Sequence, residues 1–287
     1  MINYKNQFKN NVIYCNCDDY QYSNFVKYFV DHFQELGIKK IISTCYKQNK
    51  QGLYFQYSGT TQEVRKLIGN GDFRSAECIE LLKEADIVIT NPPFSLFRDY
   101  VETVMELNKK FLIIGNCNAI KYKEIFPYIK ENKMWLGVSS FNSGMYFQVP
   151  NDYEYSETYK FDKERNGKKV MRVSSIAWFT NMEHDRRNQP MDLYMKYSNE
   201  YYPKYDNFNA IEVSKTCDIP MDFDGVMCVP ITFLDKYNPN QFEILDLVNR
   251  YMIFDYFNVN ETVRKSKSHC CNVNGEAKYS RILIKRK

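Results

Sequence analysis

The sequence has 287 residues and a formal net charge of +4, and 44% of its residues are hydrophobic and 26% charged. These values fit a globular protein that is long enough to bury a full core, as one large domain or two smaller ones. Apolar runs of only a few residues exclude a signal peptide and a membrane span, so we expect a cytoplasmic protein that contacts no membrane.

The first 137 residues alternate strand patterns with helix patterns. Short apolar runs predict buried strands at residues 11–14, 40–44, 87–89 and 111–114. Amphipathic spacing and capping residues predict helices at residues 23–37, 61–68, 75–84, 97–105 and 120–130. Repeated β-α units of this length are typical of the α/β class. We therefore expect a doubly wound, mostly parallel, Rossmann-like sheet.

After residue 137 the pattern changes to shorter strands. Strands are expected at residues 144–149 and 171–179, on either side of a hairpin turn at 165–168, and again at 223–233 and 242–247. A polar loop at residues 181–190 contains Arg186 and Arg187. The second half is thus predicted to be rich in β-structure. We expect a catalytic core over residues 1–137, and the remaining sheet strands with a partner-recognition region over residues 138–287.

The motif Asn91-Pro92-Pro93-Phe94 follows the apolar run at residues 86–90 and precedes a predicted helix. Ligands of open α/β sheets bind beyond the carboxyl ends of the strands, which is where this motif falls. Two successive prolines fix φ and remove two N–H donors, so the turn is stiff. The Asn91 amide oxygen and the Pro92 carbonyl then form a pair of acceptors beside the Phe94 ring. Such a pair suits a planar –NH₂ group.

This acceptor pair predicts methyl transfer to an exocyclic nitrogen. The N6 amine of adenine is a weak nucleophile because its lone pair is delocalised into the ring. Hydrogen bonds from its two protons to Asn91 and Pro92 favour a tetrahedral nitrogen, and Phe94 can stack on the base. The nitrogen then attacks a sulfonium methyl directly, with proximity and orientation supplying most of the acceleration. A strand that merely ends in a Pro-Pro turn is the alternative.

A methyl donor needs a pocket at the same edge of the sheet. The glycine-rich fingerprint of nucleotide-binding folds is absent, and the first strand leads instead into Cys15, Asn16, Asp18 and Asp19. These small and acidic residues would admit a methionine tail and pair its ammonium with a carboxylate. An Asp-rich turn with helix capping is the alternative.

Further donor-pocket candidates are Thr44, at the end of the second strand, and Asp72 and Phe73, which follow a turn at residues 69–71. A carboxylate that accepts a hydrogen bond from the adenine of the donor, beside a stacking phenyl ring, is chemically sensible. A solvated loop Asp beside a core Phe would look the same in the sequence.

Positive charge concentrates at the end of the chain, where residues 264–287 carry a net charge of +7 and residues 1–263 one of −3. A basic end is the electrostatic footprint of a contact with a phosphate backbone, and it makes Lys265, Lys267 and Arg281 candidates. A solvated cationic tail fits equally well. The Asn274-Gly275 pair and the apolar residues 282–284 favour an ordered hairpin.

Nine cysteines and no secretory signal indicate reduced thiols. No Cys-x₂-Cys pair occurs, and three histidines offer few further ligands, so we expect no metal site.

Segments distributed over nearly the whole chain, in order, resemble the EcoRI-type adenine-specific DNA methyltransferases. They are residues 14–19, 23–25, 71–75, 91–95, 114–116, 122–127, 178–181 and 225–245. The resemblance implies the fold of S-adenosylmethionine-dependent methyltransferases. It also implies S-adenosylmethionine as donor, adenine N6 in double-stranded DNA as acceptor, and a cognate restriction endonuclease as a possible partner.

The same resemblance implies roles for particular residues. Residues 91–94 become the catalytic motif, with Asn91 also touching the donor. The cofactor pocket is then formed by Cys15, Asn16, Asp18, Asp19, Thr44, Asp72 and Phe73. The later half supplies DNA recognition, so the candidate contacts are Arg186, Arg187, Lys265, Lys267 and Arg281.

One departure from the family pattern lies at the start of the chain. Relatives carry a helical segment before the first strand that helps to close the donor pocket, whereas this sequence reaches that strand after about ten residues. Either the true start lies upstream, or another chain completes the site, or donor affinity is weakened. We expect weaker donor binding than in a chain extended upstream. Three other functions fit the residues: N4-cytosine methylation, methylation of a protein glutamine or an RNA adenine, and a catalytically silent DNA-binding subunit.

Overall fold

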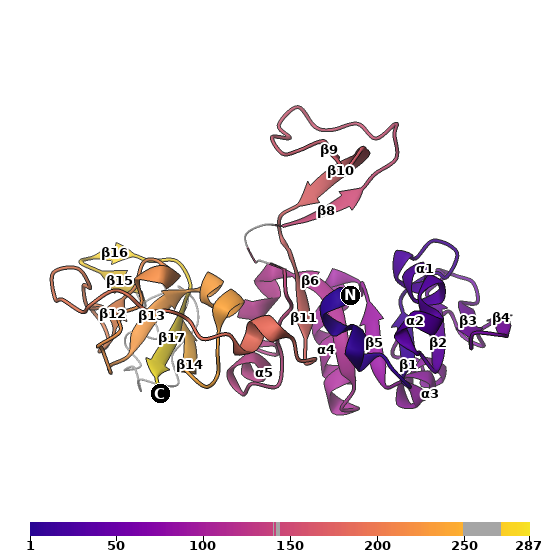
Figure 1. The fold of residues 1–287 in the computed structure, drawn as a ribbon, viewed down its shortest axis with the longest axis horizontal. Helices are drawn as coiled ribbons and strands as arrows, with labels where there is room; N and C mark the ends of the chain where they lie inside the picture. The colour runs from indigo at the N-terminus through magenta and orange to yellow at the C-terminus, as the bar shows by residue number, and fades with distance from the viewer. Residues whose placement is uncertain (140, 142–143, 249–270) are drawn as a thin grey trace. The chain divides into compact units, whose positions relative to one another are not determined.

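The structure is a computed structural model that describes residues 1–139, 141, 144–248 and 271–287. It divides into two compact units (Figure 1). The first contains Met1–Ile125 and Met134–His184, and the second Phe126–Lys133 and Asp185–Lys287. The functional boundary at residue 137 stays a prediction. Within the described ranges, no helix is both long and apolar enough to cross a membrane.

The first unit is built on an eight-stranded sheet in the order β4-β3-β2-β1-β5-β6-β11-β7. The four central strands are parallel to one another, and the flanking strands pair antiparallel. The mixed α/β class is therefore confirmed, whereas the doubly wound arrangement stays a prediction. The strands are β1 (Val12–Asn16), β2 (Lys40–Cys45), β3 (Leu53–Tyr57), β4 (Gln62–Lys66), β5 (Ile87–Thr90), β6 (Lys110–Asn116), β7 (Trp135–Leu136) and β11 (Ile176–Thr180).

Helices connect the central strands, and their ends follow the predicted caps. The Ser23 hydroxyl accepts hydrogen bonds from two backbone N–H groups at the start of α1, and Gly37 ends α2 with a φ of 62°. The helix expected over residues 23–37 is divided at His32. The helices and 3₁₀ turns of this unit are η1 (Ile2–Gln7), α1 (Asn24–Asp31), α2 (Phe33–Leu36), α3 (Ala76–Glu84), η2 (Phe94–Leu96), α4 (Phe97–Glu106) and η3 (Cys117–Lys121).

The helix predicted over residues 61–68 is wrong, because this segment forms strand β4. All five residues of β4 pair antiparallel with β3, which the sequence pattern did not reveal. The side chains of β4 are all exposed, so the segment has no buried apolar face of the kind that stabilises an amphipathic helix. Across the pair, the Arg65 guanidinium lies 4.1 Å from the Tyr54 ring centroid. Strand pairing and this cross-strand contact override a weak local helix preference.

The helix predicted over residues 120–130 is also wrong as one element. Two short helices replace it, η3 and α5 (Phe126–Lys130). Pro127 lies in the first turn of α5, where its missing N–H costs nothing. Because Pro127 has no N–H to donate to the carbonyl of residue 123, the helix does not extend backwards through this point.

A separate three-stranded sheet lies between β7 and β11 in the sequence, in the order β8-β10-β9 (Figure 1). Its strands are β8 (Met145–Gln148), β9 (Glu164–Arg165) and β10 (Lys168–Val173). The predicted hairpin turn is confirmed: Asn166 and Gly167 have φ values of 51° and 69°, as a two-residue turn between β-strands requires. The strand expected over 171–179 is divided into β10 and β11.

The second unit contains a four-stranded sheet in the order β12-β13-β17-β14 and a small hairpin, β15-β16. Asn274 and Gly275 form the hairpin turn with φ values of 53° and 77°, so the predicted ordered hairpin is confirmed. The remaining elements are η4 (Asp185–Asn188), β12 (Ile211–Glu212), η5 (Thr216–Asp218), β13 (Met227–Pro230), η6 (Ile231–Lys236), β14 (Phe242–Val248), β15 (Asn272–Val273), β16 (Glu276–Ala277) and β17 (Arg281–Arg286).

Candidate functional site

A cavity of ≈ 610 Å³ opens at the carboxyl ends of β1, β2 and β5 in the first unit. Five residues singled out from the sequence line it: Asp19, Asp72, Phe73, Asn91 and Pro93. Three of the loops that supply them follow neighbouring parallel strands, and parallel strands end at the same edge of a sheet. The structure therefore brings the predicted donor-pocket and catalytic residues to one place.

Asn91 and Pro93 of the Asn91-Pro92-Pro93-Phe94 turn line this cavity, whereas Pro92 and Phe94 do not. Asn91 is exposed at the end of β5, whereas Pro92 is buried and anchors the turn. The Pro93 carbonyl accepts a hydrogen bond from Leu96 N at 3.0 Å and begins the 3₁₀ turn η2. Phe94 is 41% exposed, which is unusual for so large an apolar ring and leaves its face available for stacking. The turn thus presents an amide and an aromatic ring on a rigid backbone.

Asp18 lies behind the cavity wall and ties the strand ends together. Its carboxylate accepts hydrogen bonds from the hydroxyls of Ser23, at 2.8 Å, and Thr90, and from the backbone N–H of Asn91. Burial raises the pKa of this carboxyl to about 6, although all three hydrogen bonds act in the opposite direction. Asp18 therefore fixes the backbone at the start of the Asn91-Pro92-Pro93-Phe94 turn, and it does not line the cavity.

The backbone of Asp18 reaches the neighbouring strand β2 as well. Its N–H donates to the Thr44 carbonyl at 3.0 Å, and its carbonyl accepts from the Ser43 hydroxyl at 2.5 Å. The carboxyl end of β1 is thereby fixed to those of β2 and β5.

Two other carboxylates on the wall are engaged in ion pairs. Lys47 Nζ lies 2.7 Å from Asp19 Oδ2, and the Arg74 guanidinium binds both oxygens of Asp72 at 3.0 and 2.8 Å. Burial opposes the shift at Asp19, but the hydrogen bond from Lys47 leaves its pKa lowered. The hydrogen bond from Arg74 likewise lowers the pKa of Asp72. Both carboxylates are therefore ionised near neutral pH.

Three of the candidate donor-pocket residues support the site from the core. Cys15, Asn16 and Thr44 are buried at the ends of β1 and β2, and the cavity lining does not include them. The Asn16 amide oxygen accepts a hydrogen bond from the Tyr100 hydroxyl, and the Thr44 hydroxyl lies 2.7 Å from that of Tyr14. These buried side chains help to fix the positions of the strand ends next to the cavity.

The sequence interpretation missed several lining residues, among them Tyr46 and Lys47. Both directly follow β2, and Tyr46 is 53% exposed. Their position was the signal that could have found them, since loops after parallel strands carry ligand contacts. An exposed tyrosine on a cavity wall offers a flat face for a heteroaromatic ring.

The candidate DNA contacts in the second unit have different environments. Arg187 is buried and donates to the Asn132 amide oxygen. Arg186 is half-buried and lines a polar cavity of ≈ 360 Å³. Lys265 and Lys267 lie outside the described residues.

Arg281 forms a buried ion pair. Its guanidinium lies 2.6 Å from Glu212 Oε1, and the two side chains are 12% and 3% exposed. The Tyr205 hydroxyl donates to the other oxygen of Glu212. This pairing occupies the guanidinium inside the unit, and the predicted phosphate contact of Arg281 stays a prediction.

The whole chain, residues 1–287, matches the family described as adenine-specific methyltransferase EcoRI. It is 44% identical to the Type II methyltransferase M.EcoRI of Escherichia coli, over 99% of this chain and 88% of that protein. The chain belongs to the EcoRI family of adenine-specific methyltransferases. The Type II methyltransferases M.MgeORF184P of Mycoplasma genitalium and M.MpnI of Mycoplasma pneumoniae are 41% and 40% identical to it. These alignments cover 100% and 99% of this chain, and 91% and 90% of the two relatives.

A pH prediction follows from Asp18. A carboxyl whose pKa is higher in the folded protein contributes stability that is complete below its unfolded value of about 4 and is lost as the pH rises through about 6. Asp18→Asn removes this titration. Between pH 4 and 7 the unfolding free energy of the wild type should therefore fall relative to that of D18N, by about 3 kcal/mol. Urea denaturation of both proteins across this range measures the difference, and a difference that is constant with pH would contradict the prediction.

A second prediction separates the structural role of Arg281 from a DNA contact. Arg281→Met leaves Glu212 charged and buried, so we expect a loss of about 3–5 kcal/mol in unfolding free energy. Lys285→Met, at an exposed position of the same strand, should cost less than about 0.5 kcal/mol. Urea denaturation compares the two variants. Unchanged stability in R281M together with weakened DNA binding would instead make Arg281 a DNA contact.

Proposed function

We propose that this protein transfers a methyl group from S-adenosylmethionine to the N6 amine of adenine within a specific sequence of double-stranded DNA. The observation that carries the proposal is the position of Asn91. It is exposed, it follows a central parallel strand, and it lines the ≈ 610 Å³ cavity together with Pro93. The names of the relatives, all Type II methyltransferases, support the same reaction class.

The residues of the cavity fit the methyl donor. A volume of this size lies within the usual range of small-molecule sites. The ionised carboxylates of Asp19 and Asp72 suit the ammonium and hydroxyl groups of the donor, and the exposed Tyr46 ring suits its adenine. Bound here, S-adenosylmethionine supplies an electrophilic methyl group on sulfur. The protein's own part is to position the acceptor amine and to exclude water.

Asn91 provides the positioning group for the acceptor. Its amide oxygen accepts a hydrogen bond from the N6 amine and thereby localises the lone pair on nitrogen, while the rigid diproline turn fixes the direction of the amide. The Asn91 backbone is itself fixed by its hydrogen bond to Asp18. Because the acceptor lies in a duplex, its base must first leave the stack, and the exposed Phe94 ring is available to stack on the extruded base.

The amide of Asn91 should be essential for the transfer and dispensable for DNA binding. Asn91→Ala removes the acceptor that orients the amine, so we expect kcat to fall by at least about 10²- to 10³-fold, with the Kd for duplex DNA within about twofold of wild type. The matched control is Asn108→Gly, at an exposed turn before β6 where Asn adopts a φ of 51° that glycine tolerates. This variant should retain full activity.

The measurement is transfer of a labelled methyl group to DNA, followed by digestion and identification of the modified nucleoside. N6-methyladenine supports the proposal. N4-methylcytosine, or no product from the wild-type protein, overturns it. A normal rate in Asn91→Ala would remove Asn91 from the mechanism.

A further inference from the structure

Residues 144–173 form the small sheet β8-β10-β9 with its connecting loop, and we call this segment the arm. Its strands pair only with one another (Figure 1). Val170 is the one buried residue between Gly144 and Val173, all of which the structure describes. A segment of this length without a hydrophobic core gains little stability from burial, so its surface chemistry calls for a functional explanation.

Several contacts within the arm are between a cationic side chain and an aromatic ring. The Arg165 guanidinium lies 3.4 Å from the Tyr146 ring centroid, and that of Arg172 lies 4.2 Å from the centroid of Phe161. Lys163 Nζ lies 5.1 Å from the Tyr155 ring centroid. A stacked guanidinium keeps its N–H donors at its edge, directed away from the ring, and Arg165 uses two of them to bind Asp162.

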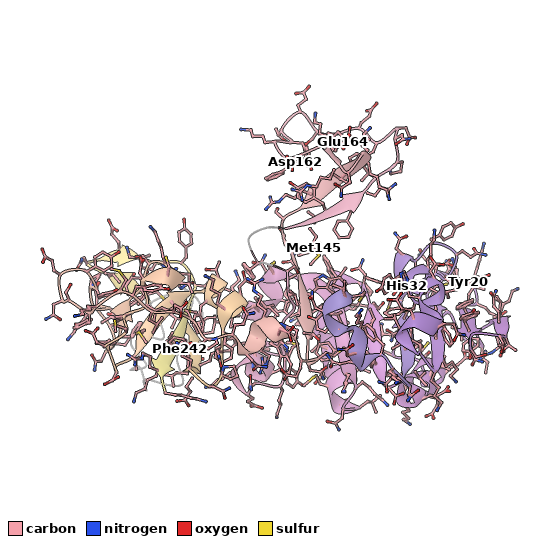
Figure 2. The ribbon with its side chains drawn as sticks, viewed as in Figure 1. Tyr20, His32, Met145, Asp162, Glu164 and Phe242 are labelled. Carbon is pink, nitrogen blue, oxygen red and sulfur yellow. The ribbon has the colours of Figure 1, made fainter. Side chains whose placement is uncertain are left out.

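The strand register places several of these cations on one face. Tyr146 is paired with Arg172, and Arg165 with Lys168. Since paired residues and residues two apart along a strand share a face, Tyr146, Arg165, Lys168 and Arg172 lie on the same side of the sheet. Asp162 partly offsets this charge, because its carboxylate binds Arg165 at 2.8 Å. Figure 2 labels Asp162 and Glu164 beside this hairpin.

Charge within the arm is strongly divided. Residues 144–159 contain three carboxylates and no Lys or Arg, whereas residues 160–173 contain six Lys or Arg against two carboxylates. The hairpin β9-β10 and the residues leading into it therefore carry a net charge of +4, and the preceding half carries −3. The positive charge of the arm is therefore concentrated in this hairpin and the residues leading into it.

We propose that the basic hairpin of the arm binds duplex DNA, with its lysines at the phosphates and its two-stranded ribbon against a groove. This inference rests on the proposed function and deepens it by locating a DNA contact. The major groove is about 12 Å wide and admits a two-stranded β-ribbon. A protein partner fits less well, because the core of a protein interface is depleted in charge. Exposed Lys and Arg beside aromatic rings are the groups that contact phosphates and bases.

The test removes charge without disturbing the stacked rings. Lys160 and Lys168 are both exposed, and the double variant Lys160→Gln/Lys168→Gln takes two charges from the basic half of the arm. The matched control is Lys27→Gln/Lys66→Gln, which takes two exposed charges from α1 and β4. β4 lies at the other side of the sheet from β11, the strand that follows the arm. DNA affinity is measured by fluorescence anisotropy with labelled duplex at several salt concentrations.

We expect the arm variant to bind DNA about 10-fold more weakly near 0.1 M salt and to lose about two from the slope of log K against log salt. S-adenosylmethionine affinity, measured by calorimetry, should remain that of the wild type, which also shows that the catalytic unit is folded. The control should bind DNA within about twofold of wild type. Equal DNA affinity and equal salt slope in the arm variant and the wild type would overturn the inference, as would equal weakening in the control.

The experiments distinguish an error in the DNA-binding role of the arm from an error in the proposed function. A wild-type protein that methylates no DNA overturns the function. A wild-type protein that methylates DNA, alongside an arm variant with unchanged DNA binding, overturns the arm alone.

Discussion

The carboxylate of Asp18 is the constraint on which the site depends. It lies in the loop after β1, and its hydrogen-bond donors are Thr90 at the end of β5, the N–H of Asn91 that follows, and Ser23, the cap of α1. Ser23 both donates to this carboxylate and accepts from the first N–H groups of α1, so one hydroxyl joins the helix to the strand ends. Burying a carboxylate raises its pKa, which is a cost, and the cost is tolerated because three donors converge on it. The turn that begins at Asn91, the cavity beside it and the start of α1 are thereby held in one arrangement.

Charged pairs around this centre keep the cavity walls fixed before a ligand arrives. Asp19 with Lys47 and Asp72 with Arg74 each hold a loop that the parallel strands alone would leave free. Such partly exposed pairs add little stability, so their contribution is to geometry. Glu212 with Arg281 is different, because it is buried and bridges two strands of the other unit. Ion pairs between carboxylates and basic side chains thus fix the loops around the cavity in the first unit and join two strands in the second.

Local signals in the sequence were sufficient for much of the first unit. The caps at Ser23 and Gly37 and the Asn166-Gly167 turn rest on interactions between residues close in the chain, and the apolar run before Asn91 marks the end of β5. The features that the sequence did not reveal depend on distant partners. Strand β4 forms because β3 pairs with it, and Arg281 is buried because Glu212, 69 residues earlier, faces it. Neither partner could be identified from composition or spacing. Tyr46 was overlooked because only its place at a strand end, and not its type, marks it.

The comparison of Arg281 with the arm shows why a count of charges in a sequence window is a weak guide to a nucleic-acid surface. The end of the chain carries the larger formal charge, yet one of its arginines is neutralised by a buried carboxylate before any partner approaches. The arm has a net charge of only +1 over residues 144–173, because its acidic and basic halves nearly cancel. Once the strands are paired, however, Arg165, Lys168 and Arg172 share one face, and most of the six cations of the arm remain exposed. A polyanion interacts with the surface charge that remains after ion pairs have formed within the protein. The fold determines which charges are paired in this way.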